Sequence, residues 1–281
     1  MTIQQALKTY KDVEIDLLLA HMLKQPKEFL YLNPQAVLTK QQTSALAALV
    51  ARRKKGEPVA YIVGYKYFYG LKFKINKNVL TPRPETEWLV ERARALMESG
   101  KWKVENKKKP KIQILDVGTG SGCIAVSLAN TLTTPGSQLT ASVTASDVSS
   151  TALKVAEQNA KTHKVTVRFI QSDLFKNIRG KFNVITANLP YVPQGMYELL
   201  YHNLKYEPKV AITDGGEVWD MYRRFFIQLP KHIKPGGAVL LEIDDGSKSD
   251  LQKMLKQLLP DYKASFYKDL NGLWRYLEIH G

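Results

Sequence analysis

Cysteine and clustered metal ligands are scarce in this sequence. It contains one cysteine, Cys123, and five scattered histidines. A single cysteine excludes an internal disulfide, and no Cys/His spacing typical of a zinc site is present, so we expect no metal. Long apolar runs are also missing. No run approaches the roughly 20 residues that cross a bilayer, and the opening stretch MTIQQALKTYKDVEID has no apolar signal core. These absences predict a soluble protein of the cytoplasm, not a membrane protein.

Acidic residues are outnumbered, with 26 Asp and Glu against 41 Lys and Arg. The excess is uneven: it is 7 in residues 1–76, 5 in residues 77–111 and only 3 in residues 112–281. A basic surface near the N-terminus suits either nucleic acid or an acidic protein partner. A lysine-rich solvated surface with no partner is an equally good interpretation of composition alone.

The first part of the chain shows helical patterns and then changes period. Thr39 and Gln42 fit a capping box, and Gly56 fits the end of the helix that follows it. From Tyr61 the stretch YIVGYKYFYGLKFKIN alternates apolar and polar residues around two glycines, which is typical of a β-hairpin. We therefore predict a helical domain over residues 1–60, a hairpin linker over 61–80 and a main domain over 81–281.

The main domain alternates strands and helices, after a charged stretch, KWKVENKKKPK, that we interpret as a linker or loop. The expected strands are IQILDV, SVTASD, VTVRFI, FNVITA, GAVLLEI, YKASFY and WRYLEI. Helical patterns separate most of them, and the last two are joined only by a turn at DLNG. This order predicts an α/β fold with an open, mostly parallel sheet, helices on both faces and a final antiparallel pair.

A glycine-rich turn joins the first of these strands to a helix in LDVGTGSGCIAVSLA. Gly118, Gly120 and Gly122 permit sharp turning and close approach of a ligand, with backbone N–H groups directed at it. The spacing G-x-G-x-G is one residue shorter than the dinucleotide fingerprint G-x-G-x-x-G. The loop therefore favours a nucleotide-like ligand without a pyrophosphate and disfavours a dinucleotide oxidoreductase.

Two later strands also end on polar residues. SVTASD ends on Asp147, whose carboxylate can accept both hydroxyls of a ribose, and the next strand leads into Asp173 and Leu174. Asp173 is positioned to accept from an adenine amino group, while Leu174 walls the ring. Either aspartate alone is as readily a helix cap or turn residue. Together with the glycine loop they predict one cofactor site at the strand ends.

The run NLPY follows the strand FNVITA and comprises Asn188, Leu189, Pro190 and Tyr191. Asparagine and proline end strands for structural reasons alone. The same residues can also hold a flat amide or base, because an amide side chain lies beside a stiff turn and an aromatic ring. Upstream, Pro82 and Pro84 prevent a helix from starting much before Glu85.

These motifs resemble those of the class I S-adenosylmethionine-dependent methyltransferases. More narrowly, they resemble the bacterial protein-(glutamine-N5) methyltransferases of peptide chain release factors, the PrmC/HemK family. The resemblance covers nearly the whole chain: GEPVAYIVG, FYGLKFKINKNVLTPRPETEWLV, DVGTGSG, ASD, SDLF, NLPY, KPGGAVLLEI and DLNGLWR. The TPRPETE stretch and its distance from the glycine loop are the most specific features.

The resemblance implies a Rossmann-like sheet of seven strands, a hairpin and an N-terminal helical bundle that recognises a protein substrate. It implies S-adenosylmethionine as cofactor, S-adenosylhomocysteine as product, and the glutamine of the release factor GGQ loop as substrate. The cofactor residues implied are Gly118, Thr119, Gly120, Ser121, Gly122, Asp147, Asp173, Leu174 and Asn188. Asn188, Leu189, Pro190 and Tyr191 would bind the substrate and support catalysis, with Arg83 and Glu85 lining the site. For Arg83 and Glu85, helix entry with a surface ion pair is a competing interpretation.

The sequence departs from this pattern at two places. The family usually has proline where Leu189 stands, and glycine where Asp244 and Asp245 follow the EI strand. Three other functions stay open: methylation of a ribosomal protein glutamine, methylation of adenine in nucleic acid, and cofactor binding without catalysis. We expect class 1 release factors as partners, no requirement for nucleic acid or membrane, and a monomer.

Overall fold

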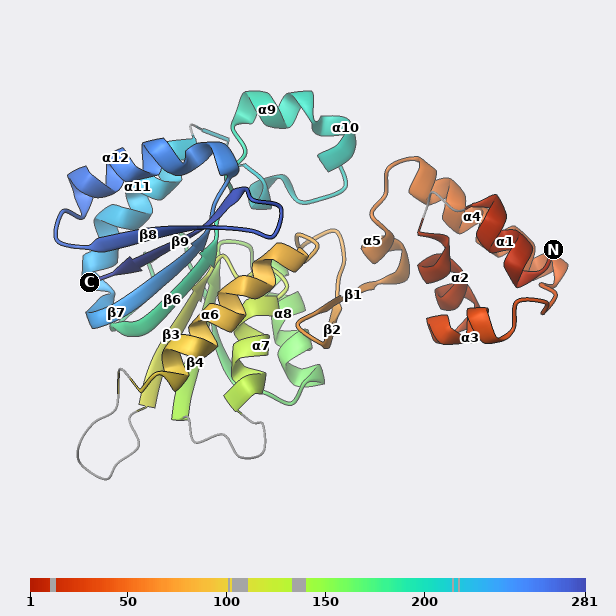
Figure 1. The fold of residues 1–281 in the computed structure, drawn as a ribbon, viewed down its shortest axis with the longest axis horizontal. Helices are drawn as coiled ribbons and strands as arrows, with labels where there is room; N and C mark the ends of the chain where they lie inside the picture. Colours follow the sequence, from red (N-terminus) through yellow and green to blue (C-terminus); the bar gives the residue numbers. More distant parts are fainter. Residues whose placement is uncertain (11–13, 101, 103–110, 133–139, 214, 217) are drawn as a thin grey trace.

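The chain folds into a group of short N-terminal helices and a larger domain built around a sheet of seven strands (Figure 1). The computed structural model describes residues 1–10, 14–100, 102, 111–132, 140–213, 215–216 and 218–281. Most of the predicted linker KWKVENKKKPK lies outside the described residues, which include only Trp102 and Lys111 of it.

The N-terminal region is helical, as predicted. Its helices are α1 (Ile3–Thr9), α2 (Ile15–Leu23), α3 (Lys27–Leu32), α4 (Lys40–Lys54) and α5 (Val59–Val63). The capping box that begins α4 is confirmed, because Thr39 Oγ1 accepts from Gln42 N at 3.1 Å and Thr39 N donates to Gln42 Oε1 at 2.9 Å. Leu18, Leu19 and Leu46 are fully buried in the apolar core that these helices share.

The hairpin begins later than the sequence pattern predicts. Tyr61 lies in α5, which follows Pro58 and ends at Gly64 with a φ of 82°. The prediction of strand from Tyr61 is therefore wrong, because proline and left-handed glycine bound one helical turn there. The strands β1 (Tyr65–Phe68) and β2 (Leu71–Lys74) pair antiparallel, and Phe68 and Phe73 are buried in the core of the larger domain.

The larger sheet has the strand order β5-β4-β3-β6-β7-β9-β8. Its strands are β3 (Lys111–Val117), β4 (Thr140–Asp147), β5 (Val167–Gln171), β6 (Phe182–Asn188), β7 (Ile233–Glu242), β8 (Lys263–Lys268) and β9 (Trp274–His280). The pairs from β5 to β7 are parallel, and β9 pairs antiparallel with both β7 and β8. The predicted fold class and the antiparallel final pair are confirmed.

Helices cover both faces of this sheet (Figure 1). One apolar core joins the sheet to α6 (Glu87–Glu98), α7 (Cys123–Leu132) and α8 (Ser150–Thr162). The other joins it to α11 (Val218–Gln228) and α12 (Lys248–Leu258). A short turn, η1 (Pro84–Thr86), leads into α6, so the prolines delay the α-helix as predicted.

The segment between β6 and α11 carries two further short helices, α9 (Gln194–Leu199) and α10 (Tyr201–Leu204), for which the sequence analysis predicted no element. Figure 1 shows them projecting beyond the end of the sheet. The Tyr206 hydroxyl donates to the Lys55 carbonyl at 3.3 Å, so the segment also touches the residue after α4. It thus connects the larger domain to the N-terminal helices.

Candidate active site

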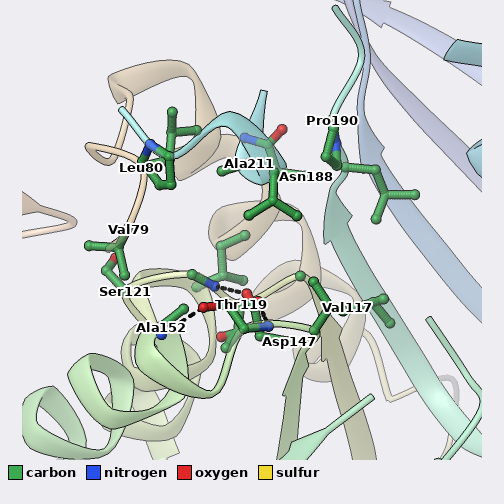
Figure 2. Close-up of a pocket in the computed structure, with 18 of the residues that line it drawn as sticks. Val79, Leu80, Val117, Thr119, Ser121, Asp147, Ala152, Asn188, Pro190 and Ala211 are labelled. Carbon is green, nitrogen blue, oxygen red and sulfur yellow. Dashed lines mark hydrogen bonds between the residues drawn. The ribbon is translucent and has the colours of Figure 1, made fainter. Parts of the chain in front are cut away.

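A cavity opens at the carboxyl ends of β3, β4 and β6, where parallel sheets bind ligands (Figure 2). It holds about 990 Å³ of space, part of it open to solvent. Its wall combines the glycine loop, the polar ends of two strands, the loop before α6 and the segment before α11. Asn188 and Pro190 lie across the cavity from Thr119 and Asp147 (Figure 2).

The glycine loop is held in a conformation that side chains disfavour. Gly118, Gly120 and Gly122 have φ values of 73°, 55° and 80°. A Cβ on Gly122 would come within 3.0 Å of Ala156 Cβ, so glycine there lets α7 approach α8. A Cβ on Gly120 would meet nothing within 4 Å. Gly120 therefore borders open space on the ligand side, which fits a backbone that a ligand approaches closely.

A buried carboxylate beneath the loop fixes it to the sheet. Asp116, at the end of β3, is fully buried and accepts hydrogen bonds from Thr119 Oγ1 at 2.6 Å and Thr186 Oγ1 at 2.9 Å. Burial raises the pKa of Asp116 to about 6, although both hydroxyls favour the ionised form. Asp116 does not line the cavity, so its role is to hold the loop from below.

Asp147 lies where the sequence analysis expected it. Its Oδ2 accepts from Gly120 N and its Oδ1 from Ser149 N, both at 2.9 Å. Burial raises its pKa above the ordinary aspartate value. Each carboxylate oxygen can accept a second hydrogen bond, so both remain able to accept from a ligand hydroxyl. The same contacts make Asp147 part of the support of the glycine loop, which the sequence did not indicate.

Asp173 and Leu174 also line the cavity. The Asp173 carboxylate forms an ion pair with Arg224 of α11, and both side chains are about half exposed. Leu174 is 6% exposed and has a φ of 46°, which is unusual for a residue with a side chain. The predicted wall at Leu174 fits this position. The adenine contact of Asp173 stays a prediction, with the carboxylate shared between Arg224 and any ligand.

The NLPY residues divide between cavity and core. Asn188, Leu189 and Pro190 line the cavity, whereas Tyr191 does not. Tyr191 instead packs against the core on the α11 side, and burial raises its pKa to about 12. Leu189 is 3% exposed and belongs to the same core. The structure thus brings three of the four residues to the site and places the ring of the fourth behind them.

The loop before α6 contributes Arg83 but not Glu85 to the cavity. Arg83 Nη2 pairs at 2.7 Å with Glu207, whose side chain is 3% exposed. Glu207 also accepts from Thr81 N at 3.2 Å. The expected surface ion pair is therefore a contact to a buried carboxylate. Glu85 is placed outside the cavity, with its backbone oxygen accepting from the Tyr276 hydroxyl at 2.9 Å.

Sequence reasoning missed three polar residues beside the cavity: Glu207, Thr86 and Glu242. Glu207 lies in the segment before α11, where no element was predicted. Glu242 is the last residue of β7, as Asp147 is the last residue of β4. The rule that selected Asp147, a carboxylate at the end of a parallel strand, would also have found Glu242.

The two departures from the family pattern have local explanations. Asp244 caps the turn η4 (Asp245–Ser247), because its Oδ2 accepts from Gly246 N at 3.1 Å. Asp245 Oδ1 accepts from Trp274 N at 2.6 Å, which ties this turn to β9. Both aspartates therefore organise a turn, and Leu189 fills core space.

Within the described ranges, no group of acidic, histidine or cysteine side chains could hold a metal ion. No helix in the same part of the chain is long and apolar enough to cross a membrane.

We expect Asp147→Ala to weaken binding of S-adenosylmethionine at least tenfold, because a ligand hydroxyl loses a charged acceptor worth ~1.5–3 kcal/mol. The fold should persist. The measurement is titration calorimetry, with thermal melting on the same preparation. Asp250→Ala is the control, since among the described residues Asp250 forms an ion pair only with Lys253, at 3.4 Å on the surface of α12. Equal affinities for Asp147→Ala and the unchanged protein would refute the ribose role.

Two family models match this chain. Residues 3–64 match the PrmC N-terminal domain, and residues 103–235 match the methyltransferase small domain. Among similar proteins, a release factor glutamine methyltransferase of Chlorobaculum tepidum is 35% identical, covering 92% of this chain and 87% of that protein. One of Lactococcus lactis is 35% identical, covering 86% and 84%, and one of Bacillus cereus is 31% identical, covering 92% and 88%.

Solved structures share the fold. The catalytic domain of hMettl16, in complex with the MAT2A 3′UTR hairpin 6, has a TM-score of 0.55 at 15% identity, covering 85% of this chain and 81% of that chain. A methyltransferase from Pyrococcus furiosus has a TM-score of 0.51 at 18% identity, covering 82% and 95%. At these identities the likeness extends to the fold alone.

Proposed function

This chain belongs to the release factor glutamine methyltransferase family, and from that premise we propose that it methylates the side-chain nitrogen of the glutamine in the GGQ loop of class 1 release factors. The methyl donor is S-adenosylmethionine and the product is S-adenosylhomocysteine. The observation that carries the proposal is the position of Asn188, which lines one cavity together with Leu189 and the glycine loop and lies across it from Thr119 and Asp147. That arrangement suits a nucleoside cofactor on one side and a flat amide on the other.

The cavity fits this cofactor. Gly120 opens onto free space beside the Asp147 carboxylate, and Leu174 walls the next strand end. The parts of the nucleoside and amino acid would be held by residues that line this cavity, with Asn188 between cofactor and substrate: Gly118, Thr119, Gly120, Ser121, Asp147, Asp173 and Leu174. Gly122 was also expected there, but it does not line the cavity and instead lets α7 approach α8. When bound, S-adenosylmethionine supplies an electrophilic methyl group on a positively charged sulfur.

The chemical difficulty is the weak nucleophile. The lone pair of an amide nitrogen is delocalised into its carbonyl. The site therefore has to raise the reactivity of this nitrogen toward the methyl group by orienting it. We infer that the Asn188 Oδ1 and the Leu189 backbone carbonyl accept the two hydrogens of the substrate amide. These contacts aim the nitrogen at the methyl group and favour its pyramidal form. As the nitrogen gains the methyl group it loses one of its two hydrogens as a proton, which can pass to water at the side of the cavity that is open to solvent.

The lining also limits water around the reacting atoms. Val117, Leu189 and Pro190 line the cavity near Asn188, and Leu189 is nearly fully buried. A water-poor site would favour methyl transfer, because the charge of a bound sulfonium would be dispersed in the transition state and no new charge would be created. Pro190 confines Leu189 to extended conformations, which stiffens the carbonyl that accepts from the substrate.

The N-terminal helices are the proposed docking surface for the release factor. They precede every residue that lines the cofactor side of the cavity, and the charge excess is concentrated in residues 1–111. We propose a monomer that acts in the cytoplasm on a protein partner, without a requirement for nucleic acid. If charge steers the encounter, raising the salt concentration should slow association of the two proteins.

Two other substrates would use the same chemistry. A glutamine of a ribosomal protein needs only a different docking surface, and an adenine amino group can bind a similar asparagine and proline. The basic N-terminal region is compatible with nucleic acid, but its compact helical bundle suits a protein partner better.

The test incubates the protein with methyl-labelled S-adenosylmethionine and three acceptors separately: release factors, ribosomal proteins and DNA. We expect label in the release factor alone. The Asn271→Ala variant, which changes an exposed turn between β8 and β9, should methylate the release factor at the wild-type rate. Label in ribosomal protein or DNA, with the release factor unlabelled, would refute the proposed substrate.

A further inference from the structure

A third carboxylate stands at a strand end beside the cavity. Glu242, the last residue of β7, is 2% exposed and pairs in the sheet with Asn188 of β6. Among the described residues it forms no ion pair of the kind that Glu207 makes with Arg83. Burial raises the pKa of Glu242, while a hydrogen bond from Thr86 and the charge of Arg275 favour its ionised form.

Thr86 connects this carboxylate to the cavity. Thr86 Oγ1 donates to Glu242 Oε2 at 2.6 Å, and Asn188 Nδ2 donates to Thr86 Oγ1 at 3.3 Å. Thr86 is 3% exposed, and both Thr86 and Asn188 line the cavity. The three side chains come from the loop before α6 and from two neighbouring strands. Their two hydrogen bonds therefore connect the core to the site.

The chemistry of the three groups fixes which group donates in each of the two hydrogen bonds. An ionised carboxylate only accepts hydrogen bonds, so the single hydroxyl hydrogen of Thr86 points at Glu242. The Thr86 oxygen is then left as an acceptor, and it takes a hydrogen from the Asn188 amide nitrogen. The nitrogen end of the amide is thereby committed inside the protein, which leaves its oxygen for the cavity.

We propose that Thr86 and Glu242 are positioning residues that hold the Asn188 amide with its oxygen facing the substrate. This inference deepens the proposed function and rests on it. With the amide turned over, Asn188 would present a donor to the substrate amide nitrogen, which itself needs acceptors for its hydrogens. The fixed orientation therefore selects a substrate that donates, such as a primary amide.

A carboxylate suits this role better than a neutral side chain. A glutamine at position 242 could both donate and accept, so it would allow either orientation of the Thr86 hydroxyl. An apolar residue would fill the same space without the cost of burying a charge. A buried carboxylate at position 242 is explained if its role is to fix the direction of the Thr86 hydroxyl.

The first test compares Thr86→Ser with Thr86→Ala. Both lose the methyl group of threonine, and they differ only in the hydroxyl. We expect Thr86→Ser to keep kcat within about threefold of the unchanged protein, and Thr86→Ala to lower kcat by about 10- to 100-fold. Affinity for S-adenosylmethionine, measured by calorimetry, should change little in either variant, because Thr86 is placed at the substrate side.

The second test uses Glu242→Met, which keeps an unbranched side chain but removes both acceptor oxygens. It should fold with at least wild-type stability, because a buried charge is replaced by an apolar group. Its kcat should nevertheless fall about tenfold or more, since the Thr86 hydroxyl is released to bond the Asn188 oxygen. A purely structural role predicts instead that activity follows stability.

Equal kcat for Thr86→Ser and Thr86→Ala, or wild-type kcat for Glu242→Met, would overturn the inference. All variants are compared with the unchanged protein on release factor in the same assay. If the unchanged protein itself transfers no methyl group to the release factor, the proposed function has failed. If the unchanged protein is active and the Thr86 and Glu242 variants are equally active, the proposed function stands and only the role of Thr86 and Glu242 in orienting Asn188 is refuted.

Discussion

Asn188→Ala is expected to lose methyl transfer by roughly 10²-fold or more, the scale seen when one oriented hydrogen-bonding group is removed from an active site. The Asn188 oxygen is the one side-chain acceptor that we assign to the substrate amide. With alanine at this position the substrate nitrogen loses the hydrogen bond that orients it toward the methyl group. Cofactor affinity should fall far less, because Thr119 of the glycine loop and Asp147 lie across the cavity from Asn188.

The measurements are single-turnover rates at saturating cofactor and calorimetric affinity on the same preparation. Asn271→Ala serves again as the matched control, since it removes an asparagine side chain from an exposed turn. Equal proportional losses in turnover and in cofactor affinity would contradict the substrate role and make Asn188 a cofactor residue.

Removal of the N-terminal helices should abolish activity on intact release factor while sparing the chemistry. The structure determines where to cut. Phe68, Phe73 and Ile75 are buried in the core shared with α6, α7 and α8, so the hairpin must stay with the larger domain. A chain of residues 65–281 keeps them, whereas a cut at residue 77 would remove all three.

We expect residues 65–281 to bind S-adenosylmethionine within a few-fold of the full chain and to methylate a short peptide containing the GGQ glutamine at a comparable low rate. Turnover of intact release factor should fall at least about tenfold, because the docking energy is gone. The peptide is the control for an intact active site. Wild-type activity of the shortened chain on intact release factor would show that the N-terminal helices do not recognise it.

Local signals in the sequence identified much of the sheet and of the cofactor side. Gly118, Gly120 and Asp147 were found because glycine-rich turns and strand-end carboxylates have short-range patterns, and parallel strands bring their ends to one edge. The structure places all three on the cavity wall. The hairpin boundary at Tyr61 was wrong because apolar alternation does not distinguish one helical turn from a strand over so few residues.

The substrate side was harder to predict because its contacts are long-range. Thr86 and Glu242 are 156 residues apart, and Arg83 and Glu207 are 124 apart. Neither pair is visible as a spacing, since each forms only when the loop before α6 packs against the sheet and the segment before α11. The direction of Tyr191, away from the cavity, likewise depends on how its backbone turns after Pro190.

Methylation of the GGQ glutamine is tested most simply by the mass of the GGQ-containing peptide of a release factor after incubation with this protein and S-adenosylmethionine. We expect the peptide to gain one methyl group, located by fragmentation on the side-chain nitrogen of the glutamine, and a release factor lacking that glutamine to gain none. An unchanged glutamine, or a methyl group on any other residue of the release factor, would contradict it.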